Sequence, residues 1–402
     1  MKSEKRDLVP RLRFPEFQDA GEWKAKLLGD CLDYIQPTKY LVSSTDYDDK
    51  YPTPVLTAGK TFVLGYTNET KGIFDKNLPV IIFDDFTTAS KFVDFPFKGK
   101  SSAMKILLAK KGVDIKFIYE AMQLIRYEVG VHERHWISIF SKLSVSVPTH
   151  FEEQQKIADC LSSIDALIAA QADKIDTLKT YKKGLMQRLF PREGESVPRL
   201  RFPEFRDAGG WEEQILGELV EIASGQVDPT DPMYCDKPHV GGENIESHTG
   251  RLQGMRTAKE LGLISGKYSF DGRDILYSKI RPALNKVATP DFEGICSADI
   301  YPIRPSSQQL CRQYLAYLLL SDGFLKYATK NSGRSKIPKV NRESLLAYVL
   351  VIPVREEQQC IADCLTSLDA LIDAHTEKLG ALNAHKKGLM QQLFPCLEAA
   401  CE

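Results

Sequence analysis

Two segments of this chain occur twice, while the segments between the copies do not repeat. A short repeat reads VPRLRFPEFQDAGEW at residues 9–23 and VPRLRFPEFRDAGGW at residues 197–211, with 13 of 15 positions identical. A long repeat at residues 152–191 returns at residues 356–395 with 26 of 40 positions identical. Internal repetition defines the structural unit of a chain, so it restricts the architecture more than any other feature. We expect one scaffold that presents two different inserts.

The long repeat is predicted to be a helix with a coiled-coil seam. Apolar side chains recur in alternating steps of four and three residues from Ile157 to Leu189, and in the same steps from Ile361 to Leu393. This heptad pattern is typical of helices that pack along their whole length. A Phe-Pro pair ends each copy, because the residue before proline disfavours the helical conformation. At about 1.5 Å per residue, each seam is roughly 50 Å long.

Two matched seams in one chain most simply pack on each other. If a pseudo-twofold axis relates the two halves, as the duplicated order implies, the helices are antiparallel and the inserts lie at opposite ends of a rod.

Two features of the repeats have two interpretations each. The seams carry polar residues at matched positions, Gln171 with His375 and Lys182 with Lys386. Such residues either fix the register of a coiled coil or extend along its surface toward solvent or a partner helix. The repeated Arg-Phe-Pro-Glu-Phe sequence either caps each insert or binds a partner.

The repeats predict four segments in chain order and a mixed α/β fold for each insert. The segments are a first domain at 1–151 that includes the short repeat, a spacer helix at 152–191, a linker with the second short repeat and a second domain at 192–355, and a second spacer helix with a tail at 356–402. Within the inserts, strands are predicted at 79–85, 144–147 and 347–353, and helices at 117–127 and 309–320. The predicted fold class is therefore α/β (α+β), with two globular domains joined by two long antiparallel helices.

Composition argues for a reduced compartment. The nine cysteines are odd in number and none forms Cys-x-x-Cys, which disfavours both a disulfide framework and a zinc site. The first residues lack the apolar core of a secretion signal, and no apolar run reaches the roughly 18 residues of a membrane helix. We expect a cytoplasmic protein that does not cross a membrane.

The sequence lacks the motifs of common nucleotide-binding and catalytic sites. Gly-Lys-Thr at 59–61 and Gly-Lys-Ser at 99–101 resemble the end of a phosphate-binding loop, but neither has the glycine required five positions earlier. Dinucleotide-binding, methyltransferase and nucleophile-turn motifs are also missing. The best acid candidates, Asp84 and Asp85, are interpreted first as a turn at the end of a strand or as hydrogen-bonding side chains. We expect no catalytic residue, no metal site and no bound cofactor.

Basic and amide side chains gather in two runs, one in each insert. Such residues neutralise phosphates and position a protein on a duplex, and arginine and asparagine also bind base edges in the major groove. The alternative for each run is a solvated basic surface. The predicted DNA-binding residues are Lys91, Lys98, Lys100 and Lys105 in the first insert, and Lys279, Arg281, Asn285, Lys286, Asn331, Arg334, Ser335, Lys336, Lys339 and Asn341 in the second.

Taken together, these motifs resemble those of the specificity subunits of type I restriction–modification enzymes, along nearly the whole chain. Three motifs each occur twice: Pro-x-Leu-Arg-Phe-Pro-Glu-Phe in the short repeat, Glu-Gln-Gln-x-Ile-Ala where each long repeat begins, and Lys-Lys-Gly-Leu-Met-Gln-x-Leu-Phe where it ends. The first insert also contains VIIFDDFTTASKFVDFPFKGKSSAMK at residues 80–105, a phrase common in such domains.

The resemblance implies a specific role in a larger assembly. Each insert would bind one half of a bipartite, asymmetric site on double-stranded DNA, and the helices would set the gap between the halves. Two methyltransferase subunits would bind the repeated regions and carry S-adenosylmethionine, while restriction subunits would bring ATP- and Mg-dependent translocation and cleavage. This chain would choose the site and catalyse nothing. The alternatives are a coiled-coil scaffold without a DNA role and a silent, spare specificity chain.

Overall fold

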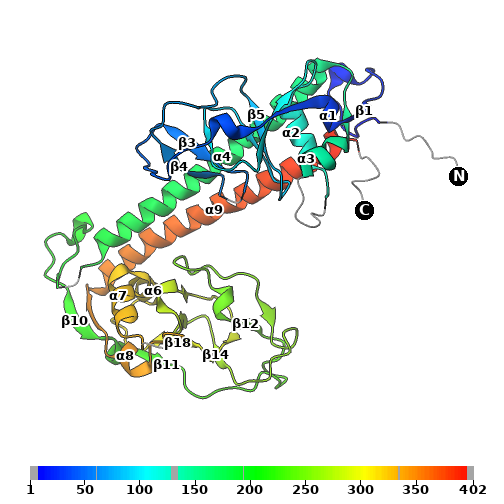
Figure 1. Ribbon diagram of the computed structural model, residues 1–402. Helices are drawn as coiled ribbons and strands as arrows, with labels where there is room; N and C mark the ends of the chain where they lie inside the picture. The colour runs from blue at the N-terminus through cyan, green and yellow to red at the C-terminus, as the bar shows by residue number, and fades with distance from the viewer. Residues whose placement is uncertain (1–7, 60, 128–134, 193, 334–335, 396–402) are drawn as a thin grey trace. The chain divides into compact units, whose positions relative to one another are not determined.

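The structure is a computed structural model that describes residues 8–59, 61–127, 135–192, 194–333 and 336–395 (Figure 1). The chain forms two compact units: the first comprises Met1–Ala172 and Glu377–Glu402, and the second comprises Asp173–Thr376. The division falls within the two long helices, α4 (Phe151–Leu189) and α9 (Arg355–Leu393). Each unit therefore contains one insert, the beginning of one long helix and the end of the other.

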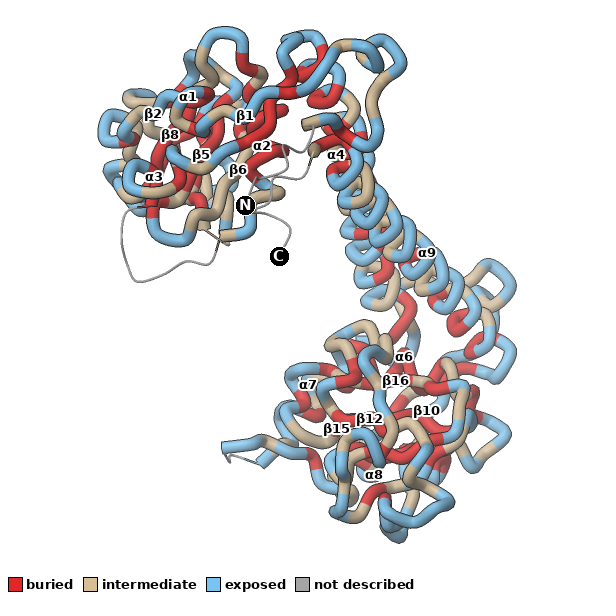
Figure 2. The backbone as a smooth tube through the Cα atoms, turned by 90° about the vertical axis from the view of Figure 1, so that its right-hand side faces the viewer, coloured by how far each residue is buried: buried red, intermediate tan, exposed pale blue. Residues whose placement is uncertain are grey.

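The helical prediction for the long repeat is confirmed. Both α4 and α9 are 39 residues long and end just before the Phe-Pro pair. Every apolar seam position from Ile157 to Leu189, and from Ile361 to Leu393, is buried or half-buried, whereas most residues between them are exposed. Figure 2 shows these buried positions recurring along the helices.

Within each unit the two helix segments are antiparallel. In the first unit, Ile157 and Leu161 of α4 share a hydrophobic cluster with Met390 and Leu393 near the end of α9. In the second unit, the end of α4 and the beginning of α9 share a cluster in the same way. The expected antiparallel arrangement is thus observed inside each unit.

The matched lysines of the seam form ion pairs across the helices. In the second unit the Nζ atom of Lys182 lies 2.6 Å from Asp369, and in the first unit the Nζ atom of Lys386 lies 2.7 Å from Asp165. Asp165 and Asp369 are themselves equivalent positions of the long repeat. Each lysine therefore faces the partner helix, and the duplicated sequence produces the same ionic contact twice.

The first insert contains a four-stranded antiparallel sheet, a three-stranded sheet and a two-stranded pair. Their strand orders are β2-β8-β5-β6, β4-β3-β7 and β1-β9, and the β3–β7 pair is parallel. The strands are β1 (Lys24–Leu27), β2 (Leu32–Ile35), β3 (Thr53–Leu56), β4 (Val63–Thr67), β5 (Val80–Asp84), β6 (Ser90–Val93), β7 (Lys98–Gly99), β8 (Met104–Ala109) and β9 (Ser144–Val147).

The second insert has closely similar topology despite its different sequence. Its sheets have the orders β11-β18-β15-β16, β13-β12-β17-β14 and β10-β19, and the β12–β17 pair is again parallel. The strands are β10 (Glu212–Ile215), β11 (Val220–Ile222), β12 (Pro238–Val240), β13 (Arg256–Thr257), β14 (Tyr268–Phe270), β15 (Ile275–Ser278), β16 (Val287–Ala288), β17 (Gly294–Cys296), β18 (Ile300–Pro305) and β19 (Val349–Ile352).

Short helices complete both inserts, and the predicted mixed fold is confirmed. The predicted helices at 117–127 and 309–320 correspond to α2 and α6, with the boundaries displaced by at most four residues. The shorter α-helices are α1 (Leu28–Cys31), α2 (Ile115–Gln123), α3 (His135–Ser138), α5 (Leu216–Leu219), α6 (Arg312–Leu320), α7 (Asp322–Lys330) and α8 (Arg342–Leu346). The 3-10 helices are η1 (Pro15–Phe17), η2 (Pro37–Tyr40), η3 (Phe140–Lys142), η4 (Pro203–Phe205), η5 (Gly242–Asn244) and η6 (Pro282–Leu284).

The short repeat ties each insert to the beginning of a long helix. The guanidinium of Arg13 donates to Glu153 at 2.7 Å, and Arg201 donates to Glu357 at 2.8 Å in the equivalent contact. Both glutamates are completely buried, so each needs a charged partner. Of the two interpretations of the short repeat, these contacts support the cap.

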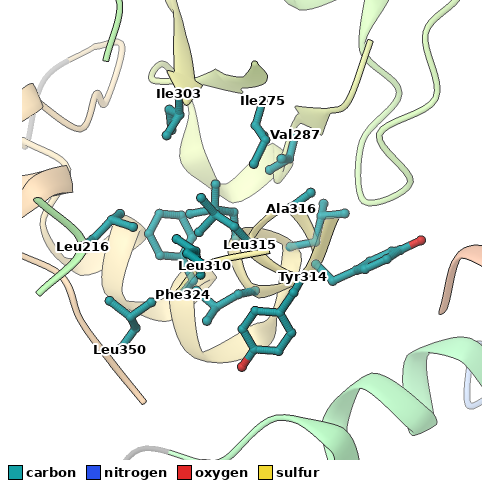
Figure 3. Close-up of a cluster of buried hydrophobic side chains, with 14 of the residues drawn as sticks. Leu216, Ile275, Val287, Ile303, Leu310, Tyr314, Leu315, Ala316, Phe324 and Leu350 are labelled. Atoms are coloured by element: carbon teal, nitrogen blue, oxygen red, sulfur yellow. The ribbon is translucent and has the colours of Figure 1, made fainter. Parts of the chain in front are cut away.

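The phenylalanine that ends each long helix packs into the base of an insert. Phe394 stacks on Phe117 of α2 with ring centroids 5.1 Å apart and meets Trp23 edge-on. In the second unit Phe190 packs on Tyr314 of α6 at 5.4 Å. Figure 3 shows Tyr314 in this second core, which extends up to the strand residues Ile275 and Ile303. Each insert is thus seated on the beginning of one long helix and the end of the other.

Candidate nucleic-acid interface

The fold brings together the two basic segments of the second insert. The amide of Arg281 donates to the carbonyl of Pro338 at 2.7 Å, and the amide of Val340 donates to the carbonyl of Lys279 at 2.9 Å. Ile280 and Lys339 form an antiparallel bridge between these contacts. The loop between β15 and β16 and the loop before α8 therefore form one continuous surface, which we call the basic edge (residues 279–286 and 336–341).

A strained turn lies at the centre of the basic edge. Arg281 and Asn285, which flank η6, adopt left-handed backbone conformations with φ of 46° and 45°. Such conformations cost about 1–3 kcal/mol in residues other than glycine, and they concentrate at functional sites. The buried amide of Asn285 holds the turn by donating to the carbonyl of Leu320 at 2.8 Å.

Three cations of the basic edge point to solvent. Arg281, Lys336 and Lys339 are exposed, and the described part of the chain offers their side chains no acidic partner. Lys279 and Lys286 are half-buried, and their ammonium groups donate to the carbonyls of Ala298 and Gly242. Unneutralised cations on one surface are what a phosphate backbone requires.

The predicted amide contacts of the second insert need correction. Asn285 is 4% exposed and supports the turn from inside, so it is not positioned to bind DNA. Asn331 ends α7 by donating to the carbonyl of Tyr327, and Asn341 begins α8 by accepting from the amide of Ser344. Both are exposed but engaged in helix caps. Arg334 and Ser335 lie outside the described residues.

The structure does not gather the four lysines predicted in the first insert. Lys98 is 2% exposed, and its Nζ atom lies 2.7 Å from Glu69 and donates to the carbonyl of Lys71. The hydrogen bond from Lys98, together with those from the amides of Ser44 and Ser43, lowers the pKa of Glu69 to about 2. The prediction that Lys98 binds DNA was wrong, because its ammonium group is buried and paired with Glu69 inside the domain.

Lys105 is likewise buried, at 1% exposure, and pairs with Asp85 at 3.2 Å. Asp85 also accepts from the amide of Trp136 at 2.9 Å. Asp84 accepts from the amides that follow it, so the two aspartates form the strand-end turn that was the first interpretation. Lys105 is therefore a buried support and not a DNA contact, which corrects the prediction.

Lys91 and Lys100 remain at the surface, half-buried. The ammonium of Lys91 lies 6.0 Å from the ring of Phe62, and that of Lys100 lies 5.8 Å from the ring of Tyr47. Aromatic rings hold a cation in place without neutralising it. Both side chains therefore keep a charge that a phosphate could use.

The described residues contain no candidate metal site and no candidate membrane span. No cluster of three or more histidine, cysteine or acidic side chains is arranged to hold a metal ion among them. Within the same residues, no helix has both the length and the apolar character needed to cross a membrane.

Comparison with known proteins identifies the family. The family model described as "Type I restriction modification DNA specificity domain" matches residues 20–180 and again 208–384. The specificity subunit of the Escherichia coli type I restriction enzyme EcoR124I/EcoR124II is 31% identical over 370 residues, which is 88% of each chain. The MjaVIII specificity subunit of Methanocaldococcus jannaschii is 25% identical over 407 residues, which is 95% of this chain and 93% of that one.

Solved structures show the same fold. The crystal structure of the type I S subunit from M. genitalium has a TM-score of 0.65 at 14% identity and covers 97% of this chain and 100% of its own. The two family matches coincide with the two halves of the duplication, one for each insert and its long helix. This chain therefore belongs to the family of type I restriction–modification specificity subunits, with one DNA specificity domain in each half.

Proposed function

We propose that this chain selects the DNA site of a type I restriction–modification complex, with each insert binding one half of a bipartite, asymmetric sequence. The proposal rests on one observation: the two inserts have closely similar strand topology but different sequences, and so they present different surfaces. Because the framework is duplicated and the exposed loops are not, the two half-sites differ. The chain itself supplies recognition, and no catalytic step is assigned to it.

The basic edge is the DNA-binding surface of the second insert. Lys336 and Lys339 contact phosphates, which gives affinity without sequence information. Arg281 stands on the strained turn, where its backbone is held on both sides, and a guanidinium in this position can bind guanine through two hydrogen bonds. We assign base recognition to Arg281 and duplex positioning to the two lysines.

The long helices act as the spacer between the half-sites. A helix of 39 residues is about 58 Å long at 1.5 Å per residue, and both helices have this length. The apolar seam and the lysine–aspartate pairs make each segment stiff. The number of residues in the helices, and not the inserts, therefore sets the gap.

Two copies of one methyltransferase subunit bind the repeated helical surfaces. Exposed residues have no packing role that would keep them the same, yet Asp159, Ser163 and Leu167 recur as Asp363, Ser367 and Leu371 on the same face. Leu167 is 58% and Leu371 42% exposed, so each copy presents an apolar side chain on the outer face of its helix. S-adenosylmethionine, ATP and Mg²⁺ belong to the methyltransferase and restriction subunits, and the complex works on cytoplasmic DNA.

Selection from random duplex DNA tests the proposal. The full chain, purified with its companion methyltransferase subunit, is incubated with a randomised library and the retained DNA is sequenced. We expect enrichment of two unlike short sequences separated by a fixed gap, with retention that falls as salt increases. Retention of DNA without an enriched sequence, or no retention, would refute the proposal in favour of a scaffold or a silent chain.

A further inference from the structure

The shared topology identifies the element of the first insert that corresponds to the basic edge. In the second insert, the basic edge includes the connection from the inner strand β15 to the outer strand β16. In the first insert, the equivalent connection runs from β5 to β6 and comprises residues 85–89. None of the lysines predicted to bind DNA lies in this connection.

The β5–β6 connection is a tight, ordered turn with exposed side chains. The carboxylate of Asp84 accepts from the amides of Phe86 and Thr87 at 2.9 and 3.0 Å. Thr88 has a left-handed backbone with φ of 59°, as Arg281 and Asn285 do in the second insert. The turn presents Phe86, which is 41% exposed, and the exposed Thr87.

A second loop lies beside this turn. The amide of Asp85 donates to the carbonyl of Ala103 at 3.0 Å, which places residues 100–103 next to the turn. Ser101 and Ser102 are exposed there, and the ammonium of Lys100 rests on the ring of Tyr47. We call this surface the hydroxyl edge (residues 86–88 and 100–102).

Buried charges hold the hydroxyl edge from behind. Asp85 and Lys105 are each 1% exposed, and Asp85 fixes the backbone of Trp136 as well as its own turn. A binding surface built on buried, fully paired groups is held in one geometry, as base recognition requires. Lys105, predicted as a direct contact, is a positioning residue for this edge.

We infer that the hydroxyl edge is the base-recognising surface of the first insert, an inference that rests on the proposed function. Hydroxyls of Thr87 and Ser102 can donate to or accept from base edges, and an exposed Phe86 ring can contact the methyl group of thymine. Lys100 supplies the phosphate contact. The first half-site is therefore read by hydroxyl and apolar contacts, whereas the second is read by an arginine.

The test compares matched variants in the selection from random duplex DNA. The variants are Thr87→Ala combined with Ser102→Ala, Phe86→Ala alone, and Arg281→Ala as the reciprocal control in the second insert. The double variant should lose about ten-fold or more of the preference at one or two positions of one half-site and keep the other half-site and the gap. Phe86→Ala should lose preference at a thymine of the same half-site. Arg281→Ala should alter the opposite half-site.

Salt dependence separates base contacts from phosphate contacts. The double variant should keep the slope of log affinity against log salt concentration, whereas Lys100→Ala should reduce its magnitude by about one. All five substituted side chains are exposed or half-buried at the surface, and circular dichroism verifies that each variant is folded. If the wild type enriches a bipartite sequence and both the double variant and Phe86→Ala retain both half-sites, this inference is refuted while the proposed function stands. If the wild type enriches nothing, both are refuted.

Discussion

Replacing Phe394 by alanine should open the core of the first unit and leave the second unit closed. The side chain is 6% exposed, stacks on Phe117 and meets Trp23 edge-on. Removal of a buried phenylalanine costs about 3–5 kcal/mol, and each aromatic contact accounts for about 0.5–1.5 kcal/mol of the loss. A region of a protein can open without global unfolding, and the free energy of that opening depends on the contacts within the region. The loss of stability should therefore appear first in the first unit, which contains the Phe394 ring.

Hydrogen exchange followed by mass spectrometry measures this difference. Peptides from α2 should exchange on the order of a hundred-fold faster or more in the variant, since each 1.4 kcal/mol is a factor of ten, while peptides from α6 should be unchanged. Phe190→Ala is the matched control and should give the reverse pattern, because Phe190 packs on Tyr314 of α6. Equal acceleration in both units, or none in α2, would refute the argument that each helix end closes a particular insert.

Three further predictions concern the helices and the corrected lysine. Lys182→Met should destabilise the second unit by about 1–3 kcal/mol, because it leaves Asp369 without its ionic partner. The double variant with Asp369→Leu should recover most of the lost free energy of unfolding, which urea denaturation measures. Glu69 has a folded-state pKa of about 2, below its unfolded value, so its contribution to stability is present above about pH 4.5 and disappears as the pH falls toward 2. Lys98→Met should weaken that acid dependence, although the amides of Ser43 and Ser44 still donate to Glu69. A variant whose stability declines between pH 5 and 2 as steeply as the wild type would contradict the assignment. Insertion of whole heptads into the long helices should widen the gap between half-sites and preserve both sequences; an altered half-site with an unchanged gap would disprove the spacer role.

The sequence was sufficient to predict the parts of the fold that depend on local periodicity. The heptad steps from Ile157 to Leu189 specify both the helix and its buried face, and a Phe-Pro pair specifies where it ends. The strand predicted at 144–147 matches β9, and those at 79–85 and 347–353 contain β5 and β19. The common topology of the inserts could not be predicted, because strand pairing joins segments far apart in a sequence without internal identity.

The candidate site was only partly predictable, because a run of basic residues in a sequence does not indicate which of their side chains are buried in the fold. Lys98 and Lys105 occur in a lysine-rich run, but the fold turns them toward Glu69 and Asp85. A signal for Lys105 was present, since it belongs to the apolar strand sequence MKILLA, where a lysine needs a buried partner. The hydroxyl edge carries little charge, so the pattern of basic residues in the sequence does not indicate Thr87 and its neighbours.

The most direct test of the account is a map of methylated bases in cells that carry this chain with its companion methyltransferase subunit. Single-molecule sequencing of their DNA should show N6-methyladenine on both strands of one bipartite, asymmetric motif, and the motif should vanish when the gene for this chain is deleted. A methyltransferase subunit that is active with another specificity chain but leaves no motif with this one would contradict the claim that this chain selects the site.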